Sequence, residues 1–345
     1  MPDQGGQHPV TIADVARHAG VSKGLVSFAL NDRPGVGSET RDRILSSAAQ
    51  LGWRPSVRAR SLSVDRSFAL GLVIARDPEI VAADPFFPTF IAGVETVLAE
   101  EGQSLVLAMT TPGRHEADTY RALALDKRVD GVFLTDLRVD DTRLPLLREL
   151  GLPALTLGEP AVPDAFPHVS SDDAAGIASV LEHLLAQGHR RIAHVAGPSV
   201  LLHACRRRRA FEEAMTAAGL RVDVVETDFS ARQGATATQH LLERPASERP
   251  TAIVYSNDPM ALAGMAVAQR AGISVPRALS ISGFDNTDLA EHVFPSLTSV
   301  ATEVVEWGRV AALTLLATLA GGEPESPAPL ATRLVVREST APPSH

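Results

Sequence analysis

Residues 11–30, TIADVARHAGVSKGLVSFAL, predict two short helices joined by a tight turn. Thr11 begins a capping box with the acid three residues later, and Gly20 can adopt the left-handed backbone that ends a helix. Ser22 then begins a second helix that runs to about Leu30. Two helices separated by three residues are typical of a helix-turn-helix, although any small helical bundle could contain such a hairpin.

A third helix and a linker follow this hairpin. Ser38 is expected to cap a helix from Glu39 to Leu51, which ends at Gly52. Residues 53–66, WRPSVRARSLSVDR, are polar and rich in arginine. Such a stretch is typical of a solvated linker, but the proline near its start also suits the first turn of a short helix.

The distribution of charge separates this segment from the rest of the chain. The whole chain carries a net charge of −9, which by itself argues against nucleic acid as a partner. Residues 10–66, however, contain nine Lys or Arg against five acids, so that this segment has a charge of +4 and the remainder −13. A basic segment joined to an acidic body is typical of a polyanion-binding domain attached to a domain of another function.

Length and composition set broad limits on the protein. The 345 residues suit two or three domains, and the single cysteine, Cys205, excludes an intramolecular disulfide and a cysteine-built zinc site. The apolar runs are too short to cross a membrane, and the N-terminus lacks the features of a signal peptide, so a cytoplasmic protein with no membrane partner is expected. We find no P-loop, no G-x-G-x-x-G after the first strand and no H-E-x-x-H, so no cofactor and no metal are expected.

Beyond residue 66 the chain alternates apolar strands with amphipathic helices, which predicts parallel α/β sheets. The expected strands are Phe68–Ala75, Ser104–Met109, Asp130–Thr135, Ala154–Leu157, Arg191–Ala196, Val222–Thr227, Ala252–Ser256 and Leu279–Gly283. The expected helices are Phe90–Glu101, Glu116–Lys127, Asp173–Gln187, Cys205–Ala218, Arg232–Leu242, Pro259–Ala271 and Val304–Ala320. Periodicity alone leaves open whether these units form one large sheet or two lobes.

The stretch from Val10 to Leu62 resembles the DNA-binding head and hinge of the LacI/GalR family of bacterial transcription regulators, and the resemblance continues to about residue 340. It implies an all-α helix-turn-helix head, a hinge helix, and an α/β body of two periplasmic-binding-protein-like lobes with parallel sheets and a ligand cleft between them. The implied divisions are a disordered tail (1–9), the head (10–54), the hinge (55–66) and a ligand-binding and dimerisation body (67–340), with lobe 1 at about 67–167 and 291–322 and lobe 2 at about 168–290 and 323–340.

The family resemblance also implies which residues contact DNA. The helix that begins after Ser22 would enter the major groove, where a thymine methyl could contact the phenyl ring of Phe28 and a guanine edge could bind Lys23. Because the family often has polar or basic residues at the positions of Gly24 and Phe28, base readout here would depend less on paired hydrogen bonds. The alternative for Phe28 is that it packs inward on the third helix. The residues of the head that are expected to lie near the bases or phosphates of the DNA are Thr11, Ser22, Lys23, Gly24, Ser27, Phe28 and Asn31.

The hinge would act in the minor groove. In the family, paired hinge helices of a homodimer insert an apolar wedge that unstacks the central base step of a pseudo-palindromic operator. Leu62 is the matching wedge, and Arg58, Ala59 and Arg60 match its groove-lining neighbours. The end of the chain, RESTAPPSH, lacks apolar heptads, so no coiled-coil tetramer is expected.

Several body segments match cleft-lining positions of the family. Aromatic rings would stack on a sugar or base, while Asp, Asn and Arg would supply directional polar contacts. The residues implied to bind ligand are Phe86, Phe87, His203, Arg207, Phe229, Asn257 and Asp285. Each has a structural alternative: Asn257 or Asp285 could cap a helix or form a turn, and Arg207 belongs to a run of four arginines that could form a solvated helix face.

The expected function is therefore a ligand-responsive, sequence-specific DNA-binding transcription regulator. We expect a repressor of carbohydrate-utilisation genes whose partners are operator double-stranded DNA, a small-molecule effector such as a sugar, and a second copy of the chain. A regulator that responds to a nucleobase or nucleoside remains an alternative, as does a sugar-binding protein or an enzyme on the same α/β body. The sequence contains no nucleophile elbow, the turn that presents the catalytic serine in many α/β enzymes, so we do not expect an enzyme.

Overall fold

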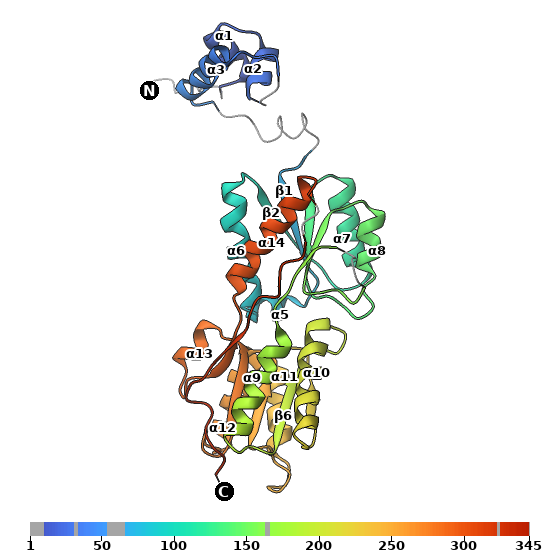
Figure 1. Ribbon diagram of the computed structural model, residues 1–345, viewed down its shortest axis with the longest axis vertical. Coiled ribbons are helices and arrows are strands. Elements are labelled where there is room, and N and C mark those ends of the chain that lie inside the picture. The colour runs from blue at the N-terminus through green and yellow to red at the C-terminus, as the bar shows by residue number, and fades with distance from the viewer. Residues whose placement is uncertain (1–9, 31–33, 54–65, 163–165, 323–324, 345) are drawn as a thin grey trace, which may run out of the picture. The chain divides into compact units, whose positions relative to one another are not determined.

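The computed structural model describes residues 10–30, 34–53, 66–162, 166–322 and 325–344. The chain divides into two compact units, Met1–Phe68 and Ala69–His345, which we call the head and the body (Figure 1). Each unit is described by itself.

The head contains the three predicted helices. The start of the first is a capping box in which the backbone N–H and the hydroxyl of Thr11 both donate to the Asp14 carboxylate, at 2.9 and 2.7 Å, and Gly20 ends the helix at φ 66°. The third helix departs from prediction at its start, because Gly37 is the cap and Ser38 is already helical. The helices are α1 (Ile12–Ala19), α2 (Lys23–Leu30) and α3 (Ser38–Gln50).

A small apolar core holds the head together. Val15, Val26 and Ile44, one from each helix, are fully buried and pack against one another. Three interlocked helices of this kind form the predicted helix-turn-helix, in which α2 follows α1 after a turn of three residues.

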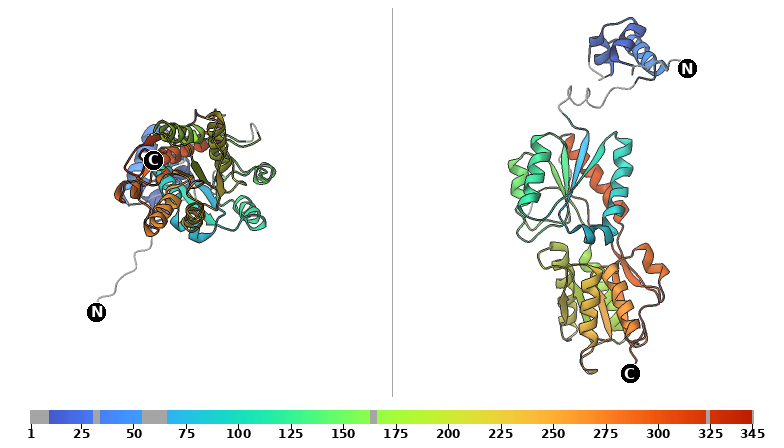
Figure 2. Two further views of the ribbon diagram at one scale, coloured as in Figure 1. Left: turned by 90° about the horizontal axis from the view of Figure 1, so that it is seen from below. Right: turned by 180° about the vertical axis from the view of Figure 1, so that it is seen from behind.

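Lobe 1 of the body is built on a five-stranded parallel sheet of order β2-β1-β3-β4-β5. Helices α6 and α14 cover one face of it and α7 and α8 the other (Figures 1 and 2). Both faces of β1 are therefore buried. The elements are β1 (Ala69–Ile74), α5 (Pro78–Ala83), α6 (Phe86–Glu100), β2 (Ser104–Met109), α7 (Arg114–Leu125), β3 (Gly131–Leu134), α8 (Arg143–Glu149), β4 (Ala154–Leu157), β5 (His168–Val169) and α14 (Val304–Leu319).

Helices α6 and α14 pack at backbone contact. A Cβ atom added at Gly93 would lie 2.0 Å from the carbonyl oxygen of Val305, and one at Gly308 would lie 2.3 Å from that of Phe90. Only glycine allows this approach. Lobe 1 is thus completed by a helix that lies about 200 residues further along the chain than its partner.

Lobe 2 contains a six-stranded sheet of order β11-β10-β9-β8-β6-β7, parallel except for β11. Helices cover both of its faces, so this lobe also has two apolar clusters. The elements are α9 (Asp173–Ala186), β6 (Ile192–Ala196), α10 (Leu202–Ala217), β7 (Val224–Glu226), α11 (Ala231–Leu242), β8 (Ala252–Tyr255), α12 (Asp258–Arg270), β9 (Ser280–Asp285), α13 (Asp288–His292), β10 (Thr298–Ala301) and β11 (Arg333–Val335).

The lobe boundaries differ from the implied ones in two places. Strand β5 pairs with β4, so lobe 1 extends past residue 167 to Val169. Strand β10 pairs with β9, so the second crossing lies after Ala301 and not near residue 290. The short strands β5, β10 and β11 and the helices α5, α8 and α13 all lie outside the predicted ranges. In the part of the chain that the structure describes, no helix is both long and apolar enough to cross a membrane.

Candidate functional site

A pocket lies between the two lobes of the body. Its walls come from the carboxyl ends of strands in both sheets, the usual ligand position in parallel α/β folds. Of the seven residues predicted to bind ligand, six line it: Phe86, His203, Arg207, Phe229, Asn257 and Asp285.

Phe87 is the exception, and its assignment to the pocket is corrected here. Its ring is only 2% exposed and packs in the core of lobe 1, with the guanidinium of Arg76 5.2 Å from the ring centroid. The reason is that α6 begins at Phe86. Consecutive residues of a helix point about 100° apart, so that one ring reaches the pocket and the next one the core.

The lobe 1 wall is organised around Arg76. One residue separates it from the end of β1. Its guanidinium donates to both carboxylate oxygens of Asp136, at 2.6 and 2.5 Å, and to Asp84 at 2.8 Å. Burial alone would raise the pKa of Asp136, but the charge and hydrogen bonds of Arg76 outweigh burial and lower that pKa to about 2. Burial dominates at Asp84 and raises its pKa. Arg76 and Asp136 thus form a rigid, fully ionised pair at the floor of the pocket.

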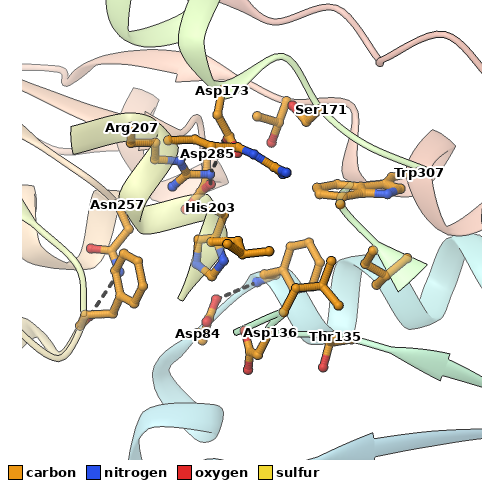
Figure 3. Close-up of a pocket in the computed structure, with 18 of the residues that line it drawn as sticks. Asp84, Thr135, Asp136, Ser171, Asp173, His203, Arg207, Asn257, Asp285 and Trp307 are labelled. Carbon is orange, nitrogen blue, oxygen red and sulfur yellow. Dashed lines mark hydrogen bonds and ion pairs between the residues drawn. The ribbon is translucent and has the colours of Figure 1, made fainter. Parts of the chain in front are cut away.

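The lobe 2 wall is organised around Arg207. It donates to the Asp173 carboxylate at 3.0 and 2.9 Å and to the Ser256 carbonyl at 2.6 Å, and its guanidinium lies 3.6 Å from the centroid of the Phe284 ring. The carboxylate of Asp285 lies 4.0 Å away, and burial raises its pKa well above the ordinary value although Arg207 lowers it. Figure 3 shows this group on the opposite side of the pocket from Asp84 and Asp136.

The other arginines of the run Arg206–Arg209 are ordinary surface residues or bridge the lobes. Arg206 donates to the carbonyl of Glu159 in lobe 1, whereas Arg208 and Arg209 pair with acids one turn along α10. Within this run Arg207 lines the pocket, whereas Arg208 and Arg209 lie on the solvated face of α10.

Asn257 lines the pocket and also caps a helix, the structural alternative given for it. Its side-chain oxygen caps α12 by accepting from the N–H of Met260 at 2.9 Å, and its amide donates to the carbonyl of Phe229 at 2.9 Å. The Phe229 ring in turn stacks on His203, with ring centroids 5.4 Å apart. Burial lowers the pKa of His203 to about 4, so this imidazole is neutral at pH 7.

The opposite end of the pocket is aromatic and apolar. Trp307 of α14 lies edge-on to Phe86, with centroids 5.7 Å apart. Leu137, Leu157 and Leu202 also line the pocket. Figure 3 shows Trp307 facing the polar residues across the pocket. A ligand held here would contact aromatic and aliphatic groups at one end and charged groups at the other.

Two hydroxyls of the pocket are unsatisfied. The oxygens of Ser171 and Thr302 are buried and find no hydrogen-bond partner among the described residues. They lie at the first and second crossings between the lobes, after β5 and after β10. Buried hydroxyls are nearly always hydrogen-bonded, so these two indicate sites for a ligand or water.

Sequence reasoning missed several of these residues. Arg76 and Asp136 immediately follow predicted strands, and a search for polar residues at strand ends would have found them. Asp173, Ser171, Thr302 and Trp307 had no such signal, because their role depends on where the chain crosses between the lobes. Within the described ranges, no group of three or more His, Cys, Asp or Glu could hold a metal ion.

The head presents part of the predicted DNA-binding set. Lys23 and Gly24 are exposed at the start of α2, and Phe28 is 42% exposed, which argues against its packing inward. The Ser22 hydroxyl accepts from the N–H of Leu25 at 3.2 Å, so it caps α2, while Ser27 is half-buried. Asn31, Arg58, Ala59, Arg60, Leu62 and the predicted tail and hinge helix lie outside the described residues.

Comparison with known proteins agrees with these observations. A family model described as bacterial regulatory proteins, lacI family, matches residues 11–56, and one described as periplasmic binding protein-like domain matches residues 181–340. The chain is 33% identical to the HTH-type transcriptional regulator CelR of Thermobifida fusca over 336 residues, which are 95% of this chain and 98% of CelR.

Two solved structures are similar over nearly the whole chain. A complex of the transcriptional regulator CelR with cellobiose has a TM-score of 0.74 and 32% identity, covering 96% of this chain and 99% of that one. The lac repressor dimer bound to operator and the anti-inducer ONPF has a TM-score of 0.82 and 27% identity, covering 97% and 100%.

Proposed function

Because the chain belongs to the LacI family of bacterial regulatory proteins, we propose that it is a homodimeric repressor of carbohydrate-utilisation genes that responds to a sugar bound in the pocket. It is a DNA-binding transcription regulator with an effector-binding body. Such a protein acts on the bacterial chromosome, so we expect it in the cytoplasm and on the nucleoid when bound to DNA.

The pocket carries the proposal of a sugar. Two unsatisfied hydroxyls, at Ser171 and Thr302, need partners, and a polyhydroxylated ligand can both donate to them and accept from them. Phe86 and Trp307 offer faces and edges for the C–H surface of a pyranose, while Asp285 can accept from hydroxyls. The related CelR binds cellobiose, which supports the same class of ligand here.

The DNA-binding part of the proposal rests on the head and the hinge. Exposed Lys23, Gly24 and Phe28 on α2 suit the major groove, and Leu62 with its arginine neighbours suits the minor groove by sequence. The lac repressor, similar over 97% of this chain, is a dimer on its operator, which supports a homodimer. Exposed apolar side chains at Leu107, Met109 and Phe294 provide surface for a second copy.

The test begins with selection of operator sequences from a random duplex pool by the full chain. Fluorescence anisotropy on the selected duplex then measures the affinity with and without cellobiose, glucose, ribose and adenosine. We expect tight binding to a pseudo-palindrome and a change of several-fold or more with a sugar. Asp285→Ala should abolish this response while leaving operator affinity without sugar near normal, because the head is a separate unit.

Adenosine tests the second candidate. The neutral imidazole of His203 stacked on Phe229 could extend a stack onto a nucleobase, which favours a nucleoside over other non-sugar ligands. A response to adenosine and to none of the sugars would replace the carbohydrate assignment. If none of the tested compounds changed the operator affinity or the melting temperature, both candidate functions would be contradicted.

A further inference from the structure

We propose that Asp258, which does not line the pocket, is the positioning residue that holds the Asp285 carboxylate in place for ligand. This inference rests on the proposed ligand site and names a residue on which the site depends. Asp258 is the first residue of α12 and is fully buried. Three hydrogen bonds, two of them made by its own carboxylate, connect it to the turn that follows Asp285.

Both carboxylate oxygens of Asp258 accept hydrogen bonds, one from the turn itself and one from Ser299, which in turn binds the turn. One accepts from the backbone N–H of Thr287 at 2.6 Å. The other accepts from the hydroxyl of Ser299 at 2.6 Å, and the oxygen of Ser299 accepts from the backbone N–H of Asn286 at 3.1 Å. The two peptide N–H groups that follow Asp285 are thus both fixed, one directly and one through Ser299.

The turn needs such support because its backbone is strained. Asp285 has φ 101° and Asn286 has φ 50°, values that residues with side chains rarely adopt. Such strained conformations persist only where the surroundings impose them. At the end of β9 this unusual backbone places Asp285 in the pocket, 4.0 Å from Arg207.

The fold leaves space for the supporting carboxylate. A Cβ atom at Gly283 would lie 2.1 Å from a carboxylate oxygen of Asp258, so the β9 backbone passes directly over that group only because residue 283 is glycine. The same strand therefore accommodates Asp258 at residue 283 and presents Asp285 two residues later, on the same face of the strand.

The buried position of Asp258 also affects its charge. Burial raises the pKa of Asp258 to about 6, while Ser299, Thr287 and the charge of Arg337 lower it only partly, and Asp285 is the neighbouring acid. Asp258 is thus ionised at pH 7.5 at a cost to the folded state. A buried carboxylate kept ionised against that cost is a strong acceptor for the two N–H groups of the turn.

The first experiment needs no ligand. Hydrogen exchange of the full chain at pH 7.5 should show the amides of Asn286 and Thr287 protected in the parent and exchanging at least about tenfold faster in D258N. The matched control is T238V, which removes other buried hydrogen bonds of lobe 2. The Thr238 hydroxyl donates to the carbonyl of Gly234 at 2.7 Å and lies at hydrogen-bond distance, 2.6 Å, from the hydroxyl of Tyr255. T238V should lower the melting temperature and leave exchange of the turn unchanged.

The second experiment measures cellobiose affinity by calorimetry for the parent, D258N, D285N, the double variant and T238V. D258N should weaken binding about tenfold, T238V should not, and D258N should add almost nothing in the D285N background, because Asp258 acts through Asp285. An additive double variant, or D258N with normal affinity where D285N has lost it, would overturn the proposal.

Failure of the ligand assignment would look different. If the parent did not bind cellobiose, the sugar proposal would fail, and if D285N bound it as the parent does, the assignment of Asp285 to the ligand would fail. In both cases the exchange experiment would still decide the role of Asp258 in the turn. Equal exchange of the Asn286 and Thr287 amides in the parent and D258N would overturn the inference whatever the pocket binds.

Discussion

Replacement of Asp136, whose charge lies at the floor of the pocket, should lower the free energy of unfolding of the body by an amount that follows from the structure. In Asp136→Asn the buried guanidinium of Arg76 loses its two-oxygen partner and keeps only Asp84, whose pKa is raised by burial. A pKa of about 2 for Asp136, against about 3.8 for an ordinary aspartate, corresponds to roughly 2–3 kcal/mol of folding free energy at neutral pH. Both side chains are only 13–14% exposed, so solvent screening is weak.

Urea unfolding of the full chain, followed by circular dichroism, measures this loss. We expect D136N to reduce the free energy of unfolding of the body by about 2–4 kcal/mol at pH 7.5. Because the folded-state pKa of Asp136 is lowered, its contribution is present above about pH 4 and is lost as the pH falls through about 2. The difference between parent and D136N should therefore stay constant from pH 7.5 to 5 and shrink below about pH 4.

The control is Glu306→Gln, which removes a carboxylate from an exposed pair with Arg309. Since both partners are more than 40% exposed, the change in stability should be much smaller. Equal effects of D136N and E306Q, or a D136N effect that does not change between pH 5 and 3, would show that the ion pair at the pocket floor does not stabilise the body.

Three further variants test the remaining assignments. Phe28→Ala should reduce the preference for one base position in each operator half-site by about fivefold or more, whereas equal loss on all duplexes would make Phe28 merely structural. Thr302→Val removes an unsatisfied buried hydroxyl, so sugar affinity should fall about fivefold while the melting temperature holds or rises; normal affinity in calorimetry would exclude contact with ligand. Gly197→Ala would place a methyl group 2.0 Å from the ring of Phe229, so the displaced ring should weaken effector binding without altering operator affinity, and an unchanged thermal shift with the effector would count against a role for this ring.

The sequence predicts the local structure well where local chemistry decides it. The capping box at Thr11 and the left-handed Gly20 predict α1 correctly, and apolar periodicity predicts the long helices and strands of the body. The short strand β10 was not predicted, because its residues, TSVA, include two with hydroxyl side chains and do not form an apolar run. The crossing near residue 290 was implied by the family resemblance, whereas the pairing of β10 with β9 puts it after Ala301.

The pocket was predictable only in part. Residues within long family motifs, such as Arg207 and Asp285, line it as expected. The hydrogen bonds of Asp173 with Arg207 and of Asp258 with the turn after Asp285 join distant elements, so the sequence alone does not show them. Phe87 shows the opposite error, since its position beside Phe86 gave no sign of which ring would face the core until the start of α6 was known.

The contact between α6 and α14 has a consequence for synthesis on the ribosome. Chains emerge from the N-terminus at about 5–20 residues per second, so the helix that covers one face of the first sheet arrives last among the helices of the body described here. Until Gly308 has emerged, Phe90 and Val94 of α6 lack the partner surface that buries them. The nascent first lobe must therefore wait, with apolar surface open to chaperones, while most of the intervening lobe is already available to fold.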